Sequence, residues 1–208
     1  MSDNSSELST SRLEAFSDGV FAIAITLLII EIKVPSHDDL KNQSLMHYIW
    51  QQWPKYFAYF LSFVIIGIYW ANHHYLFKLF KRTNHVFNLL NVFFLMTIAF
   101  LPYPTGVLGD YIITVEHAKP AVTFYAFAIW LPSFAWLLIW LYASHKRRIV
   151  DYKLTHHFVT KLTQQYYVSN VFYISAFVIS LFSAVASITI CVGLTLLYLL
   201  PPRKTEYE

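Results

Sequence analysis

Long apolar stretches alternate with short polar or basic segments along this chain. A helix needs roughly twenty mainly apolar residues to cross a bilayer. The pattern therefore predicts six membrane-spanning helices, at Leu13–Val34, Tyr56–Phe77, Val86–Leu108, Ala121–Ser144, Gln165–Phe182 and Ser183–Leu200. We detect no internal repeat, so we expect one all-α membrane domain over residues 1–208, with short tails at 1–10 and 201–208.

The end of the chain allows two interpretations. Residues 166–200 carry no charged side chain, and this run is too long for one helix across a bilayer and too short for two full ones. We interpret it as two spans joined by a tight turn near Ser183 or Ser187. The alternative is a single tilted helix that follows a segment lying in the membrane interface.

The Lys and Arg residues predict the orientation, because cytoplasmic loops of membrane proteins are enriched in them. With six spans and a cytoplasmic N-terminus, the inner segments hold eleven of the fifteen. The outer segments hold the other four, Lys33, Lys41, Lys55 and Lys119. We therefore predict a plasma-membrane protein with both termini in the cytoplasm. The first nine residues are polar and acidic, which argues against a cleaved signal peptide.

Composition agrees with a membrane protein. Hydrophobic residues make up 57% of the chain, charged residues 13%, and the mean hydropathy is +0.47, whereas soluble domains carry about a quarter charged residues. The net charge of +3 is small, and the basic residues are spread over separate loops. We therefore expect the lipid bilayer as a partner, and neither nucleic acid nor a cofactor.

Polar residues of the first three helices fall at one depth, just inside the predicted cytoplasmic face. These residues are Ser17, Asp18, Trp70, Asn72, His73, His74, Asn88 and Asn91. Unpaired polar groups are costly in hydrocarbon, so we expect them to bond with one another. We also expect Arg12 to extend towards this level and pair with Asp18. The alternative is three ordinary helix ends with hydrated polar residues.

The first helix carries an apolar stripe above Asp18. Ile23, Leu27 and Ile30 recur at i, i+4 and i+7, and Thr26 flanks them, so these side chains lie on one face of the helix. Stripes of this kind usually pack against neighbouring helices, and the spacing alone favours that interpretation.

Three segments resemble a known family. The motif RxxxFSD from Arg12 to Asp18, continued by GVFAIAITLLIIEI, is similar to the signature of the transmembrane protein 175 family of potassium channels. WANHHYLF from Trp70 and, more loosely, NHVFNLLNVFFLMTIAFLPYPT from Asn84 resemble it as well. The likeness covers most of the chain and is weak after about Ala121. The chain length and the predicted span number resemble single-repeat prokaryotic members.

The resemblance implies a potassium-selective, leak-like cation channel that also passes Rb⁺ and Cs⁺. It implies a homotetramer whose four first helices surround the pore. Ile23 would form the constriction, Leu27 and Ile30 further apolar rings, and Thr26 would supply a hydroxyl associated with selectivity. The sequence contains neither a TVGYG filter nor a ladder of arginines within a span, so we expect neither a carbonyl filter nor voltage sensing.

The resemblance also implies that the family motif residues are structural and do not coordinate ions. On this chain the resemblance implies a network of Arg12, Phe16, Ser17, Asp18, Trp70, His73 and Asn91. His74 is the alternative partner to His73. In this interpretation the network anchors the first helix, and the helix moves about it when the pore opens.

Two other classes of membrane protein are alternatives. A secondary transporter usually has inverted repeats, broken helices and a polar site at mid-membrane, and only Pro132 hints at such a break. A histidine-rich metalloenzyme would use pairs such as His73–His74 and His156–His157, but several of the nine histidines lie on the opposite predicted side. We expect no metal site beyond transient K⁺ in the pore.

Overall fold

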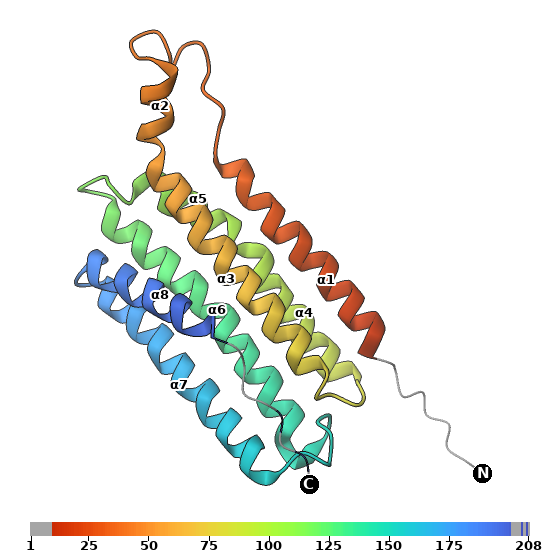
Figure 1. Ribbon diagram of the computed structural model, residues 1–208. Coiled ribbons are helices and arrows are strands. Elements are labelled where there is room, and N and C mark those ends of the chain that lie inside the picture. Colours follow the sequence, from red (N-terminus) through yellow and green to blue (C-terminus); the bar gives the residue numbers. More distant parts are fainter. Residues whose placement is uncertain (1–9, 201–204, 206, 208) are drawn as a thin grey trace.

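The computed structural model describes residues 10–200, 205 and 207, and arranges them as a bundle of helices (Figure 1). Short 3-10 turns, η1 (Leu28–Glu31) and η2 (His145–Arg147), extend the helices α1 and α6. The predicted all-α class is confirmed, while most of the predicted tails lies outside the described residues. The α-helices are α1 Thr10–Leu27, α2 Leu45–Gln51, α3 Trp53–Phe77, α4 His85–Phe100, α5 Pro102–Tyr111, α6 Ala118–Ser144, α7 His156–Ser180 and α8 Ala184–Tyr198.

Within the described residues, four helical segments are long and apolar enough to cross a membrane. The third of them has a junction at Leu101, where α4 ends and α5 begins with Pro102. Proline lacks the N–H that would continue the hydrogen-bond ladder, but it fits the first turn of a helix. The four segments correspond to the first four predicted spans and are Thr10–Glu31, Trp53–Phe77, His85–Tyr111 and Ala118–Arg147.

The uncharged run at the end of the chain forms two helices with a turn at Ser183, as predicted. Neither α7 nor α8 is among the four described helices that are long and apolar enough to cross a membrane. Ser183 caps α8, because its hydroxyl oxygen accepts a hydrogen bond from the N–H of Ala186 at 3.2 Å. Ser187 is buried and donates to the carbonyl oxygen of Ala176 on α7 at 2.8 Å. With 15 residues, α8 is about 22 Å long, which is shorter than a bilayer core of about 30 Å.

Two helices begin where the apolar pattern predicted loops. Ser44 starts α2 inside the 36–54 segment by accepting a hydrogen bond from the N–H of His47 at 3.2 Å. Thr155 does the same for α7 by accepting from the N–H of Phe158 at 3.2 Å, so α7 begins at His156 and not near residue 165. Apolar runs mark what lies in hydrocarbon, whereas capping residues mark where a helix starts.

The α3–α4 and α6–α7 loops pack against each other at one end of the bundle. The N–H of Lys81 donates to the carbonyl oxygen of Ile149 at 3.0 Å, and the N–H of Asp151 donates to that of Leu79 at 2.8 Å. We call this end of the bundle the basic end, because its two loops carry Lys78, Lys81, Arg82, Lys146, Arg147, Arg148 and Lys153.

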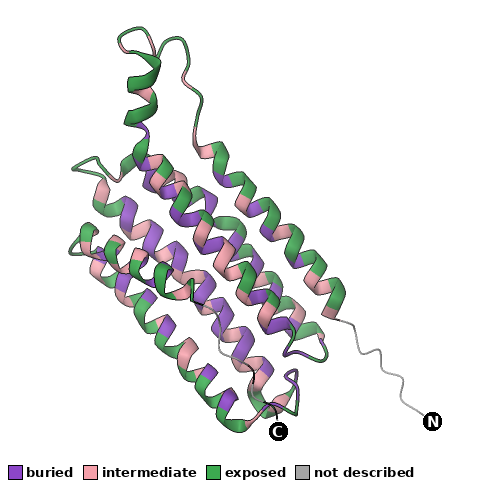
Figure 2. Cartoon of the chain, viewed as in Figure 1, coloured by how far each residue is buried: buried purple, intermediate pink, exposed green. Residues whose placement is uncertain are grey.

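The helices differ greatly in how much of their surface the bundle covers. α6 packs against α4, α5, α7 and α8, and 61% of the residues in its most apolar stretch of 18 are buried. α1 lies at one edge of the bundle, opposite α7 (Figure 1), and only 22% of the residues in its most apolar stretch of 18 are buried. Figure 2 shows the contrast as a continuous buried stripe on α6 and a largely exposed α1. The chain thus leaves one apolar helix mostly uncovered.

Candidate functional site

α1 has a covered face and an uncovered face. The covered face of α1 packs on α3 and α4 and carries the buried residues Ser17, Phe21 and Ala24. Leu28 of η1, which packs on α3 and α5, is buried as well. The predicted apolar stripe lies on the uncovered face, where Ile23 is 61% exposed, and Leu27 and Ile30 are exposed as well. Thr26 and Phe16 are also exposed. The stripe therefore does not pack inside its own chain.

The hydroxyl of Thr26 is used within α1. Its oxygen lies 2.8 Å from the carbonyl oxygen of Ala22 and 3.0 Å from that of Ile23, one turn earlier in each case. Bonding of this kind lets a hydroxyl lie in an apolar environment without another partner. Its oxygen still has accepting capacity on the uncovered face.

A buried chain of hydrogen bonds joins α1, α3 and α4. Ser17 Oγ donates to the carbonyl oxygen of Leu13 at 2.7 Å and therefore accepts from Asn91 Nδ2 at 3.0 Å. This fixes the orientation of the amide, so that Asn91 Oδ1 faces His73 Nε2 at 3.1 Å. Because an amide oxygen can only accept, the His73 Nε2 carries the hydrogen. Ser17, His73 and Asn91 are all fully or almost fully buried.

Aromatic rings fix the orientation of the His73 imidazole. Phe77 stacks on it with a centroid distance of 4.1 Å, and Phe94 lies parallel to it at 6.0 Å. Phe21 of α1 contacts its edge at 5.6 Å, and Trp136 of α6 lies at 5.8 Å. The side chain that bonds to Asn91 is therefore held from four sides, whereas His74 is exposed.

A second contact joins α1 to α3 closer to the surface. The indole Nε1 of Trp70 donates to Asp18 Oδ1 at 2.9 Å. The acceptor is a carboxylate, which makes this hydrogen bond stronger than a neutral one. Trp70 is 48% exposed, so the contact lies at the rim of the buried chain and not within it.

The predicted pair of Arg12 with Asp18 is not formed. Arg12 is exposed, and the ion pairs within residues 10–200 join other residues. Asp18 follows Arg12 by six positions, which places the two side chains about 120° apart around α1 and about 9 Å apart along it. Trp70 bonds to the carboxylate instead. Asn88 is also outside the network, and its buried Oδ1 has no partner among the described residues.

A second buried polar cluster, at the opposite half of the bundle, was not predicted. Thr105 on α5 donates to Ser62 Oγ on α3 at 2.7 Å, and Ser62 Oγ lies 3.0 Å from the hydroxyl of Tyr125 on α6. Hydroxyl residues in apolar runs give no signal, because they can also bond within their own helix. Residues 105–109, which share letters with a potassium filter, are helical in α5, so this segment does not form a loop filter.

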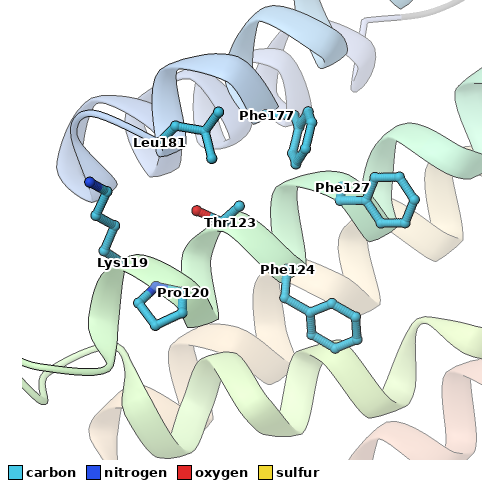
Figure 3. A pocket seen from close by; sticks show the side chains of 7 residues that line it. All are labelled: Lys119, Pro120, Thr123, Phe124, Phe127, Phe177 and Leu181. Carbon is cyan, nitrogen blue, oxygen red and sulfur yellow. The ribbon is translucent and has the colours of Figure 1, made fainter.

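The remaining titratable residues form no evident reaction centre. The described residues contain no group of three or more His, Cys, Asp or Glu side chains placed to hold a metal ion. A cavity of about 510 Å³ lies between α6 and α7 at the end opposite the basic end (Figure 3). Three phenylalanines line it, with Lys119 as its charged side chain. It carries no set of groups suited to acid–base or nucleophilic catalysis.

These features define a multi-pass all-α membrane protein in which an uncovered apolar helix is held by polar contacts at one end. Residues 12–102 match the family described as endosomal/lysosomal potassium channel TMEM175. The chain is 38% identical to a potassium channel of Chamaesiphon minutus over 92% of this chain and 94% of that protein. It is 40% identical to a potassium channel of Streptomyces collinus over 67% of each chain.

A solved structure agrees with these similarities. The crystal structure of a lysosomal potassium-selective channel TMEM175 homolog from Chamaesiphon minutus has a TM-score of 0.82 with this fold at 37% sequence identity. The match covers 91% of this chain and 96% of that chain. This chain belongs to the TMEM175 family. Its relatives are described as ion channels and not as enzymes.

Proposed function

We propose that this chain is a potassium-selective, leak-like cation channel, formed by four copies with α1 of each copy around a central pore. The observation that carries the proposal is the uncovered stripe on α1. The helix packs on its own chain through one face only and leaves Ile23 61% and Ile30 64% exposed. Relatives over nearly the full length are described as potassium channels, and a symmetric ring of four supplies a path along the uncovered faces.

In this assembly, Ile23, Leu27 and Ile30 form successive apolar rings. Four isoleucine side chains at one level exclude water from a narrow passage, and an ion cannot pass without its hydration shell or a substitute for it. Ile23 forms the constriction. Thr26 places a hydroxyl oxygen next to that ring, in a position to replace part of the hydration shell of K⁺.

The network of Ser17, Asp18, Trp70, His73 and Asn91 sets the rotation of α1. Ser17 and Ile23 lie about 120° apart around the helix. Bonding Ser17 into the bundle therefore turns Ile23 away from α3 and α4 and towards the pore. The network holds the end of α1 nearest the basic end, so opening occurs by rotation or spreading of the helix about it. Arg12 and Phe16 belong to the family motif and are exposed. They precede Ile23 by eleven and seven positions and so lie within about 20° of it around the helix, which continues the uncovered face towards the basic end.

The basic end faces the cytoplasm of a plasma membrane in this proposal, because its two loops hold seven of the fifteen Lys and Arg residues. The six helices α1, α3, α4–α5, α6, α7 and α8 then form the membrane domain, and both termini are cytoplasmic. α8 enters from the outer side and ends within the bilayer, whereas Tyr207 pairs with Leu154 at the basic end.

The test is an ion-flux assay with the purified protein in liposomes, using K⁺, Rb⁺, Cs⁺ and Na⁺ in turn. We expect K⁺, Rb⁺ and Cs⁺ to pass more readily than Na⁺. Ile23→Ala and Ile23→Asn should raise conductance and weaken this preference. Ile29→Ala, an exposed isoleucine of the same segment outside the stripe, is the matched control and should behave like the wild type. Unchanged currents from both Ile23 variants would remove Ile23 as the constriction.

Two further measurements are needed. The first distinguishes an anchoring role of Asp18 from a role in ion selectivity, and the second distinguishes a channel from a carrier. Asp18→Ala removes the acceptor of Trp70 and should reduce tetramer recovery on size exclusion more than it alters ion preference. A fully assembled Asp18→Ala protein with only a selectivity defect would contradict the anchoring role. Single-channel current steps support a pore, whereas flux that saturates at low turnover would support a secondary transporter instead.

A further inference from the structure

A second cavity, of about 550 Å³, lies among α3, α6, α7 and α8, away from α1. It exists because α8 is short. α8 packs on α7, α6 and α3 and ends beside the middle of α6 (Figure 1). Its last residues, Leu197 and Tyr198, line the cavity together with Leu200. The volume is within the range of ordinary ligand sites, about 300–1,000 Å³.

The wall formed by α7 changes from polar to apolar with depth. Lys161, Gln165, Val168 and Phe172 line the cavity at intervals of four, three and four residues, so they form one stripe along the helix. Lys161 lies about 7.5 Å along α7 from its start at the basic end, and Phe172 about 24 Å. The charged and amide side chains are thus near the membrane surface, and the apolar ones are near its middle.

The facing wall on α3 repeats this order. Asn72 lines the cavity about 7.5 Å from the end of α3 at the basic end, the same depth as Lys161. Ile68 and Ile65 continue the wall towards the middle of the membrane. The two walls together make a slot with polar groups at its entrance and branched and aromatic side chains deeper inside.

At the entrance of the slot, Asn72 Nδ2 donates one of its two hydrogens to the carbonyl oxygen of Ile68 at 2.9 Å within α3. The polar groups deep in the slot are mostly bonded to the protein. Thr195 donates to a carbonyl oxygen of its own helix, Ser169 bonds with Tyr198, and Asn170 Nδ2 donates to Ser133 O at 3.1 Å. Asn170 Oδ1 is the exception, since it has no partner among the described residues.

Lys161 and Gln164 at the entrance are exposed. Lys161 is the charged side chain of the lining, and the described lining contains no carboxylate. An entrance of this kind favours an anionic group with acceptor oxygens.

We propose that this slot binds an anionic phospholipid from the leaflet at the basic end, with its phosphate beside Lys161 and Asn72 and one acyl chain between α3 and α7. A lipid fits better than a second copy of the chain, because α7 lies at the edge of the bundle opposite α1 (Figure 1). This step rests on the proposed function: in a tetramer built around α1, the slot faces the surrounding membrane. Other basic residues at the same end raise the local concentration of anionic lipid.

The experiment is native mass spectrometry of the purified protein titrated with dioleoyl phosphatidylglycerol or dioleoyl phosphatidylcholine. We expect the wild type to retain phosphatidylglycerol in preference to phosphatidylcholine. Lys161→Ala should weaken phosphatidylglycerol binding about five-fold, the effect of one cation near a membrane surface. Val168→Trp places a large ring in the slot at an exposed position and should reduce binding of both lipids.

Lys153→Ala is the matched control, since it removes the same charge from the same end but outside the slot. It should bind both lipids like the wild type. Equal retention of the two lipids by the wild type overturns the proposal, as does an equal loss in Lys153→Ala and Lys161→Ala, which would indicate general attraction to basic loops. Lipid binding is measured without ion flux, so its failure is distinguishable from failure of the proposed channel.

Discussion

Asn91 is the residue whose replacement best tests the link between α1 and the bundle. Asn91→Leu keeps the side-chain size but removes both hydrogen bonds, to His73 at 3.1 Å and to Ser17 at 3.0 Å. Ser17 keeps its bond to the carbonyl oxygen of Leu13, whereas the His73 Nε2–H loses its partner. The cost therefore comes mainly from the buried imidazole.

The expected loss of unfolding free energy follows from two limits. A buried donor left without a partner costs about 1–3 kcal/mol in proteins generally. Hydrogen bonds between membrane helices average about 0.6 kcal/mol, with a maximum of about 1.7. The aromatic rings around His73 leave it fully enclosed, so the upper part of the membrane range applies. We expect Asn91→Leu to lower the free energy of unfolding by about 1–2 kcal/mol.

A double-mutant cycle tests whether the loss of stability comes from the hydrogen bond between Asn91 and His73. His73→Phe keeps an aromatic ring between Phe77 and Phe94 but leaves Asn91 Oδ1 without its donor, so it should also destabilise. In the double variant both groups are apolar, and replacing both partners of a hydrogen bond is much less costly than removing one. We expect the double variant to be more stable than the sum of the single effects by about 1 kcal/mol.

Unfolding in sodium dodecyl sulfate, followed by tryptophan fluorescence in mixed micelles, measures these free energies. Asn88→Leu is the control, because Asn88 is on the same helix and its buried Oδ1 has no described partner. It should be neutral or stabilising. An Asn91→Leu protein as stable as the wild type, or strictly additive effects in the cycle, would refute the role of the buried chain.

The remaining predictions concern other parts of the bundle. A Cβ added at Gly109 would lie 3.0 Å from the Cα of Lys55, so Gly109→Ala should destabilise by about 1–3 kcal/mol in the same unfolding assay; Gly67→Ala, where nothing lies within 4 Å, should be neutral or stabilising, and the opposite order would contradict the close approach. The backbone N–H of Lys153 lowers the pKa of the Asp151 carboxyl at the basic end. A lowered pKa in the folded state adds stability above the ordinary carboxyl pKa, and this stability is lost as the pH falls through the folded value. The wild type should therefore melt higher than Asp151→Asn at neutral pH, and the difference should shrink in acid; a difference independent of pH would exclude this contribution.

The lengths and order of the first four spans could be read from the sequence, because hydrocarbon requires continuous apolar runs of a fixed length. The turn at Ser183 followed from the same rule. The start of α7 at His156 was missed, because the cap at Thr155 lies in a polar segment that the apolar pattern does not mark.

The depth of the polar residues in the membrane could also be predicted, but their hydrogen-bond partners could not. Alternating helix directions placed Ser17, Asp18, His73 and Asn91 at one level, and the structure brings them close together. Which atoms bond between helices depends on how each helix is rotated, and this rotation decided that Trp70 bonds to Asp18. The expected partner Arg12 fails for another reason, because its spacing of six positions from Asp18 places the two side chains about 120° apart around α1.

The sequence by itself determined an all-α membrane protein, the positions of its first four spans and a stripe of apolar residues on α1. Only the tertiary structure decided that this stripe is left uncovered, that Asn91 links three helices, and that the short α8 leaves a slot beside α7. The physical reason is that positions facing lipid and positions facing other helices are both apolar in a membrane. Hydrophobicity therefore fixes how far a helix extends, while packing fixes which way it faces.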